Sequence, residues 1–144
     1  DTLGYSAIKF KQKDVWGLLT RVDGPFAGKK HIEASDLIGQ PLLCSEQSYR
    51  RNEFDGWLND LRADLNIVGT FNLLYNAYVL ATAGVGHVLA LDGIINPTAT
   101  SGLVWLPLYP RLECDIVIAW NHSRNLSPAS KRLIALLKEE EAKI

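Results

Sequence analysis

The chain has 144 residues, 47% of them hydrophobic and 22% charged, and its formal net charge is −1 at pH 7. These values are typical of a globular domain and exclude a disordered or collagen-like chain. The near-neutral charge argues against nucleic-acid binding by this segment itself, because contacts to phosphates require a clustered basic surface.

The sequence shows neither a membrane-spanning run nor a signal peptide. No apolar run reaches the roughly 18 residues that a membrane-spanning helix needs. Residues 1–14 carry charges without the hydrophobic stretch of a signal peptide, and the chain contains no Met. We therefore expect it to begin after processing or inside a longer gene product, and we expect no membrane partner.

Apolar runs rich in β-forming residues predict two strands in the first third of the chain, at 15–22 (VWGLLTRV) and 40–44 (QPLLC). Between them, the polar segment 31–37 predicts a single helical turn capped by Ser35. A polar loop is expected at 45–49, directly after the second strand.

Two helices and a strand are expected in the middle of the chain. Residues 50–61 place apolar side chains on one helical stripe, made of Phe54, Trp57, Leu58 and Leu61. A short strand follows at 66–69. Residues 73–83 are apolar almost all round, which is typical of a helix buried on more than one side, and Thr70 or Asn72 is its expected cap.

Three strands and a helix are expected in the last part of the chain. Two of the strands lie at 87–91 and 103–108. The third, at 115–120 (DIVIAW), is nearly all apolar, as in a central strand covered on both faces. The dipeptide Ser127-Pro128 predicts the start of the final helix, with Ser as N-cap and Pro in the first turn. This alternation of strands and helices predicts an α/β layer structure around a mostly parallel sheet.

The sequence carries no phosphate-binding loop and no pattern of metal ligands. Gly28-Lys29-Lys30 lacks the other residues of a P-loop, and Ala83–Gly86 follows a predicted helix instead of preceding one. His31, His87 and His122 are scattered without paired spacing. We therefore expect no cofactor and no metal.

Neither of the two cysteines lies in a recognisable nucleophile motif. Cys44 ends a predicted strand near Arg50 and Arg51, whose charges would lower the pKa of its thiol. A small apolar core residue is nevertheless the favoured interpretation. Two reduced thiols, Cys44 and Cys114, are favoured over one disulfide. With no catalytic residue in evidence, the sequence predicts that the chain is not an enzyme.

Polar residues lie where two predicted strands lead into helix starts. Ser45, Gln47 and Ser48 follow the first strand, and Thr70 and Asn72 follow the second. Backbone N–H groups at helix starts attract anions, and ligands of open α/β sheets lie beyond the carboxyl ends of the strands. Helix capping explains the same residues, so a ligand pocket and plain capping are both open interpretations.

Four segments also stand in a characteristic order. They are DVWGLLTRVDGPFAGKKHIEASDLIGQPLL from Asp14, NIVGTFNLLYNAYVLATAGVGHVLALD from Asn66, Trp120, and NLSPASKRLIALLK from Asn125. This ordered set resembles the effector-binding (substrate-binding) domain of LysR-type transcriptional regulators. No single motif carries the resemblance, which extends over most of the chain from about Asp14.

The resemblance implies a periplasmic-binding-protein-like α/β fold of type 2, with a three-layer lobe, a mostly parallel sheet and part of a second lobe. Residues 1–13 would end the first lobe and form the crossing. Residues 14–101 would form the second lobe, and 102–144 would return to the first lobe with the C-terminal helix. The earlier part of the first lobe and the DNA-binding domain are expected to lie outside this chain.

The implied function is sensing of a small molecule, anionic or polar, that binds between the lobes and modulates DNA binding and transcription. The regulator would be a bacterial, cytoplasmic homo-oligomer, a dimer or a tetramer, that holds DNA only through an N-terminal helix-turn-helix domain. Ser48 matches the reactive Cys of the peroxide-sensing branch, which argues against redox sensing. The expected effector contacts are Ser45, Gln47, Ser48, Thr70, Phe71 and Asn72.

Two other functions stay open from the residues. A solute-binding protein of similar fold that serves transport would need a signal peptide upstream of Asp1. A small α/β enzyme would need acid, base or nucleophilic groups gathered in one pocket.

Overall fold

The computed structural model describes residues 4–97 and 101–143. The chain divides into two compact units. Unit 1 comprises Asp1–Asp14 and Cys114–Ile144, and unit 2 comprises Val15–Glu113.

The sequence placed the return to the first lobe at residue 102. In the structure the strand that follows this point pairs within unit 2, which therefore continues to residue 113.

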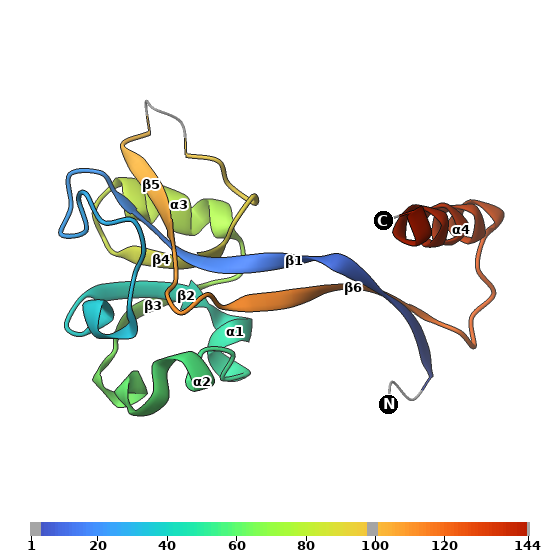
Figure 1. Ribbon diagram of the computed structural model, residues 1–144, viewed down its shortest axis with the longest axis horizontal. Helices are drawn as coiled ribbons and strands as arrows, with labels where there is room; N and C mark the ends of the chain where they lie inside the picture. Colours follow the sequence, from blue (N-terminus) through green and yellow to red (C-terminus); the bar gives the residue numbers. More distant parts are fainter. Residues whose placement is uncertain (1–3, 98–100, 144) are drawn as a thin grey trace. The chain divides into compact units, whose positions relative to one another are not determined.

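Unit 2 is a sheet with helices on both faces (Figure 1). The strand order is β3-β2-β4-β1-β5. The elements in chain order are β1 (Tyr5–Arg21, of which residues 15–21 belong to unit 2), η1 (Ala34–Leu37), β2 (Pro41–Ser45), α1 (Glu46–Arg50), α2 (Asp55–Leu58), η2 (Asn59–Asp64), β3 (Asn66–Phe71), α3 (Leu74–Thr82), β4 (His87–Leu91) and β5 (Leu103–Pro107).

The sheet is mixed in direction. β2 runs parallel to β3 and to β4, whereas β1 runs antiparallel to β4 and to β5. Helical connections separate β2, β3 and β4 along the chain, and such connections produce parallel neighbours. The predicted α/β layers are therefore confirmed, and the parallel pairing is confined to the β3-β2-β4 part of the sheet.

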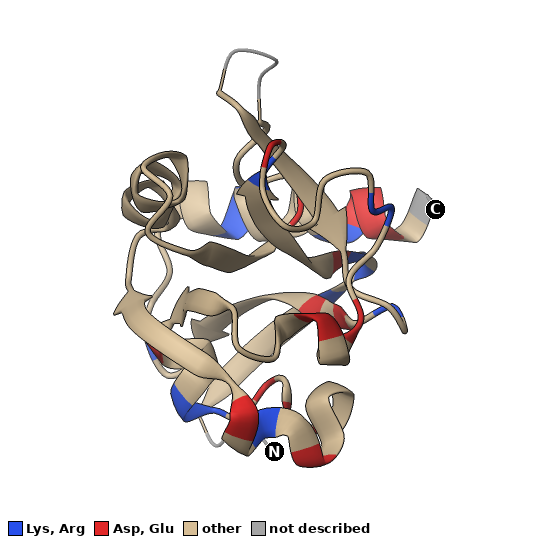
Figure 2. Cartoon of the chain, turned by 90° about the vertical axis from the view of Figure 1, so that its left-hand side faces the viewer, with Lys and Arg blue, Asp and Glu red and all other residues tan. Residues whose placement is uncertain are grey.

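Two clusters of buried side chains cover the two faces of this sheet. One cluster joins α2 to the strands through Trp57, Leu58, Leu42 and Leu89. The other joins α3 to the opposite face and consists of Ala77, Ala81, Val88, Ala90, Leu19, Leu43 and Leu103. Successive strand residues alternate between faces, so both clusters draw on the same strands. Figure 2 shows these strands almost without charged residues, as burial on both sides requires.

The region after β2 differs from the prediction. Residues 46–50 form the helix α1 where a loop was predicted, and the predicted helix 50–61 is divided into α2 and η2. Asn52 and Asn59 adopt left-handed backbone angles, with φ of 57° and 52°, and this conformation interrupts an α-helix. The apolar stripe is still recognisable, because Phe54, Trp57 and Leu58 are buried.

Helix α3 is less buried than predicted. Only Ala77 and Ala81 of α3 are buried, while Tyr75 is 69% exposed and Val79 is 50% exposed. The expectation of burial on more than one side is wrong, because only the small residues of α3 are fully buried against the sheet, while Leu74 and Tyr78 pack there partly buried. Gly84 follows the helix with φ of 78°, a conformation that favours glycine at a helix C-terminus.

The cap of the helical turn η1 also differs from the prediction. Its N-cap is Glu33 rather than Ser35, and the Asp36 carboxylate accepts a hydrogen bond from the Glu33 N–H at 2.9 Å. Asp36 therefore supplies the capping oxygen that was expected from Ser35.

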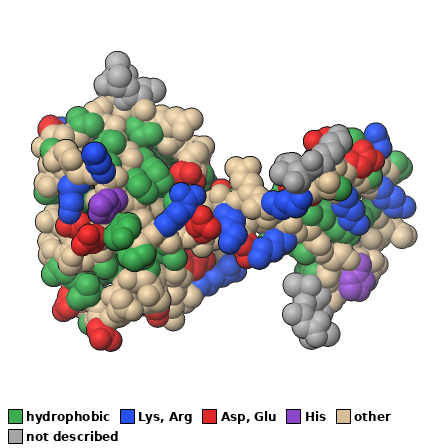
Figure 3. Space-filling view, viewed as in Figure 1, with side chains coloured by type: hydrophobic (Ala, Val, Ile, Leu, Met, Phe, Trp, Pro, Cys, Tyr) green, Lys and Arg blue, Asp and Glu red, His purple; other side chains and the backbone are tan. Residues whose placement is uncertain are grey.

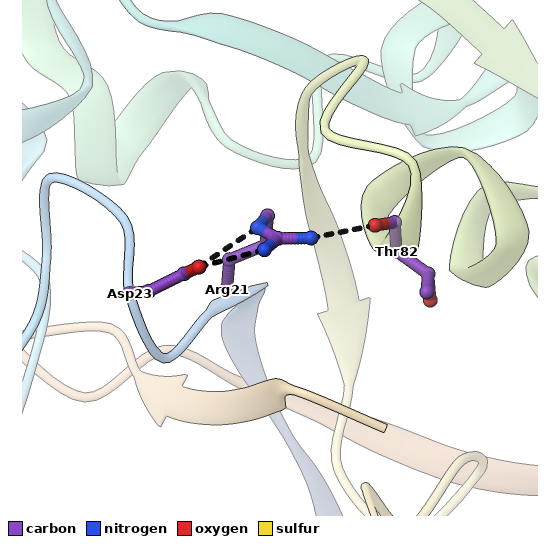
Figure 4. Close-up of polar contacts among 3 residues, drawn as sticks. All are labelled: Arg21, Asp23 and Thr82. Carbon is purple, nitrogen blue, oxygen red and sulfur yellow. Dashed lines mark hydrogen bonds and ion pairs between the residues drawn. The ribbon is translucent and has the colours of Figure 1, made fainter. Parts of the chain in front are cut away.

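Arg21 joins the end of β1 to the end of α3 (Figure 4). Its guanidinium donates to both carboxylate oxygens of Asp23, at 2.8 and 2.7 Å, and to the carbonyl oxygen of Thr82 at 2.8 Å. The positive charge thus lies at the helix C-terminus, where the helix dipole favours a cation.

Unit 1 consists of the first part of β1, β6 (Glu113–Asn121) and α4 (Pro128–Lys143). β6 pairs with β1. Figure 3 shows basic and acidic side chains side by side along these strands, and the Lys9 ammonium lies 2.6 Å from the Asp115 carboxylate. The predicted cap of α4 is confirmed, because the Ser127 hydroxyl accepts from the Ser130 N–H at 3.1 Å.

The prediction that 115–120 is a central, doubly covered strand is wrong. Val117 and Ile118 of β6 are exposed. Among the described strands β6 pairs with β1 alone, so its apolar residues are only partly covered.

No helix in the described part of the chain combines the length and apolar character needed to cross a membrane.

Candidate functional site

The carboxyl ends of β2, β3 and β4 lie at one edge of the sheet, because these strands are parallel. Ser45 at the end of β2 lies opposite Phe71 at the end of β3, and Cys44 lies opposite Thr70. Two of the predicted contact segments, 45–48 and 70–72, are therefore neighbours in space. This is the edge at which open α/β sheets bind ligands.

The same edge is where β1 enters unit 2. Asp92, directly after β4, accepts a hydrogen bond from the Val15 N–H at 3.0 Å through its carboxylate. Its own N–H donates to the Val15 carbonyl oxygen at 2.9 Å. These two bonds fix the end of β4 to the strand that links the two units.

The two helix starts at this edge are built differently. Ser45 is the N-cap of α1, and its hydroxyl accepts from the Ser48 N–H at 3.5 Å. The N-cap of α3 is Leu73, without a side-chain bond, so the predicted capping of this helix by Thr70 or Asn72 is wrong. The reason is that β3 continues to Phe71, which places both residues before the helix. Neither side chain hydrogen-bonds to another residue in the described ranges, so both remain available to a ligand.

A shallow hollow of about 370 Å³ lies between α1 and the start of α3, lined by Glu46, Gln47, Arg50, Arg51 and Asn72. Glu46 and Arg50 form an ion pair at 2.6 Å. With its amide oxygen toward Arg51, Gln47 accepts from both terminal guanidinium nitrogens, at 2.9 and 3.2 Å. Two guanidinium groups against one carboxylate leave an excess of positive charge, which suits an anionic or polar ligand group.

The structure thus brings Gln47 and Asn72 together and adds residues that the sequence analysis missed. Arg50 and Arg51 were considered only for their effect on Cys44, although both line the hollow. Two adjacent arginines one turn after a polar helix start are the signal that could have found them. Ser48 lies apart from this group, since it is buried and lines a different cavity.

Cys44 is a core residue rather than a reactive thiol. It is 2% exposed, and burial raises the pKa of its thiol to about 11, against a smaller opposing effect of the Arg62 charge. Lowering of this pKa by Arg50 and Arg51 is therefore not observed. Both cysteines are thiols, with Cys114 half-buried at the start of β6. In the described part of the chain, no three His, Cys, Asp or Glu residues are grouped to hold a metal ion.

The chain was compared with known proteins. No curated protein matches it. The model of the LysR substrate binding domain family matches residues 10–142. The effector binding domain of QuiR in complex with shikimate has a TM-score of 0.81 at 16% identity, and the match covers 99% of this chain and 68% of that one.

Two further solved structures share the fold. The PA01 protein, a putative LysR family transcriptional regulator from Pseudomonas aeruginosa, has a TM-score of 0.76 at 16% identity, covering 97% of this chain and 50% of that one. The regulatory domain of CcmR from Synechocystis PCC6803, in complex with 2-PG, has a TM-score of 0.73 at 16% identity, covering 95% and 67%. The chain spans half of the PA01 protein and 48% of HinK, another regulator of Pseudomonas aeruginosa.

At these identities the solved structures establish the fold, a type 2 periplasmic-binding-protein-like α/β fold of which this chain covers one lobe and part of another. The family model covers nearly the whole chain. The chain therefore belongs to the LysR substrate binding domain family.

Proposed function

We propose that the chain is the small-molecule-sensing regulatory domain of a bacterial LysR-type transcription factor. The observation that carries this proposal is the meeting of Ser45, at the N-cap of α1, with Phe71, at the end of β3, beside the cationic hollow. The effector is a small anionic or polar molecule. The homologous domains crystallised with shikimate and with 2-PG support a ligand of this kind.

Each effector contact has a distinct role in this proposal. The Ser45 and Thr70 hydroxyls and the Gln47 and Asn72 amides hydrogen-bond to the polar groups of the effector. Phe71 packs against its apolar part. Ser48, which was expected among these contacts, is buried and lines a different cavity, so it is not part of the proposed effector site. Arg51 provides the charge for an anionic group, because its guanidinium already lies at the border of the hollow.

The regulatory output belongs to the whole transcription factor. Effector binding in a cleft between two lobes shifts the geometry of a cytoplasmic homo-oligomer, which binds DNA through a helix-turn-helix domain outside this chain. The exposed apolar side of α3, with Leu73, Tyr75 and Val79, is the proposed self-association surface.

The proposal is tested by thermal melts of the chain with a panel of small carboxylates that includes shikimate. At least one carboxylate should raise the melting temperature in a concentration-dependent way. Arg51→Gln should weaken its affinity about tenfold, since a charge-assisted hydrogen bond is lost. Arg132→Gln is the matched control, because Arg132 is an exposed residue of α4 whose single ion pair within the described residues, with Glu139, is distant at 3.9 Å. Equal affinities of the two variants would contradict the assignment of the hollow.

A further inference from the structure

Unit 2 contains a second and larger cavity on the other side of α1 from the hollow. Its volume is about 640 Å³, and it lies between α1, α2, η2 and the face of the sheet that carries Cys44 and Leu89. Ligand pockets for drug-sized molecules measure about 300–1,000 Å³. All of its lining residues belong to unit 2. The cavity is therefore large enough for a ring-sized molecule and is built by this unit alone.

The inner wall of the cavity is apolar. Leu58, Leu89 and Cys44 line it and are almost completely buried. Because burial keeps the Cys44 thiol protonated at neutral pH, this residue adds no charge to the wall. The wall therefore suits an apolar ring or short chain.

Ser48 contributes a polar group to the wall of the cavity. Ser48 is 6% exposed and lines the cavity, and its hydroxyl makes no hydrogen bond to the residues of the described ranges. No fully buried side-chain oxygen or nitrogen in the described ranges lacks a partner, so this hydroxyl is accessible from the cavity, where a bound molecule or water can hydrogen-bond to it. The amide of Asn66 lines the same cavity.

The charges at the rim do not favour an anion. The Arg62 guanidinium forms an ion pair with Asp55, donates to the Tyr49 carbonyl oxygen at 3.2 Å, and lies 5.5 Å from the centre of the Tyr49 ring. Its charge is thus directed at protein groups. Asp60 also lines the cavity and forms no ion pair within the described residues, so the excess charge at the rim is negative.

We propose that this cavity is a second small-molecule site of the domain, which takes an uncharged or cationic amphipathic molecule with a ring-sized apolar body. The ring packs against Leu58 and Leu89, and the Ser48 hydroxyl hydrogen-bonds to the polar group. The two sides of α1 therefore select different ligands. The hollow with Arg51 takes the anionic effector, and the cavity with Asp60 takes a molecule that lacks negative charge.

Three probes of matched size test this site, namely benzyl alcohol, benzylamine and benzoate. Each is titrated into the ¹⁵N-labelled chain while amide chemical shifts are followed. Benzyl alcohol and benzylamine should shift the amides of Ser48, Leu58 and Leu89, and benzoate should bind there about fivefold more weakly than benzylamine. Absence of shifts at these amides with every probe, or strongest binding of benzoate there, would overturn the proposal.

Substitutions of single residues test which side chains contribute to probe binding at the cavity. Asp60→Asn should weaken benzylamine about threefold and leave benzyl alcohol unchanged. Asp64→Asn is the matched control, since Asp64 is an exposed residue of the same η2 element that does not line the cavity. Ser48→Leu should abolish binding of both probes by filling the cavity. If that variant fails to fold, Ser48→Ala should instead weaken benzyl alcohol about fivefold through loss of one hydrogen bond.

The result also separates this proposal from the effector assignment. Probe shifts confined to Gln47 and Arg51 would overturn the second site while leaving the effector hollow in place. Amide shifts at the cavity in a chain that binds no carboxylate at the hollow would overturn the effector assignment and leave the second site in place.

Discussion

The two faces of the unit 2 sheet are covered in opposite ways. On one face, the nine-residue helix α3 lays the small residues Ala77 and Ala81 against the strands. On the other face, the short pieces α1, α2 and η2 contribute large anchors, and the rings of Trp16 and Phe54 meet edge to face with centroids 4.7 Å apart. Small residues let a helix approach a sheet closely, whereas large anchors hold the chain away from it.

This difference explains where space for ligands arises. A regular helix with alanines on its inner side leaves little room beneath it. The left-handed backbone at Asn52 and Asn59 breaks the other cover into pieces that span the sheet without filling the gap, and the cavity of about 640 Å³ remains. The face covered by α3 is therefore tightly packed. The candidate sites lie on the face covered by α2 and at the edge where β2, β3 and β4 end.

The largest expected effect comes from removing an anchor of the α2 face. Trp57 is buried, and its indole N–H donates to the Pro110 carbonyl oxygen at 3.0 Å. Trp57→Ala should lower the free energy of unfolding by about 3–5 kcal/mol, as measured by denaturant titration. Trp57→Phe retains a ring and should lose less, about 1–2 kcal/mol. A loss below about 1 kcal/mol for Trp57→Ala would show that this face does not depend on its aromatic anchors.

The next effect contrasts the packing of the two faces directly. Ala81→Leu inserts a larger side chain where α3 meets the sheet and should cost about 1–3 kcal/mol of stability. Ala63→Leu places the same side chain beside the cavity and should change stability by less than about 0.5 kcal/mol. Thermal melts of the two variants give the comparison. Equal losses would mean that both faces are equally tightly packed.

A smaller effect is expected from acid. His87 is 9% exposed, lies on the same side of β4 as Leu89, and accepts or donates a hydrogen bond at 2.7 Å to the Thr20 hydroxyl. Burial lowers the pKa of His87 below its usual value. The unfolded chain therefore takes up a proton first as the pH falls below about 6.5.

As the pH is lowered from the unfolded-state pKa of His87 to its folded-state pKa, the free energy of unfolding should decrease by up to about 1.4 kcal/mol per pH unit. Above this window, His87 should cause no change of the free energy of unfolding with pH. Urea titrations from pH 7.5 to pH 5 measure this slope. His87→Gln keeps a hydrogen-bonding group and should remove the slope. A variant that lost stability as steeply as the parent chain would assign the acid effect to other groups.

Most strands could be read from the sequence because they are runs of apolar, β-forming residues, as in 87–91 and 40–44. Residues 5–14 of β1, in which charged and apolar residues alternate, were not predicted. The final helix could be read because Ser127 and Pro128 mark its start. The predicted set of polar residues at the strand ends was also brought to one edge by the parallel pairing of β2 and β3. That inference needed only chain order and the rule that ligands lie at this edge.

Other features depend on information that local patterns do not contain. The periodicity of 50–61 is helical, yet Asn52 and Asn59 divide the segment, since a helical stripe does not report single left-handed residues. The apolar character of 73–83 and 115–120 predicted burial, but the number of covering layers is set by tertiary structure. The hollow was missed because Asn72 meets Gln47 and Arg51 only across the folded edge, although the two adjacent arginines are visible in the sequence.

The most direct test of the effector assignment is a map of amide chemical shifts with the carboxylate that raises the melting temperature most. Shifts are expected at residues 45–51 and 70–74, with little change at Leu58 and Leu89 beneath α2. Shifts that avoid both segments at the strand ends would contradict the assignment of this edge as the effector site.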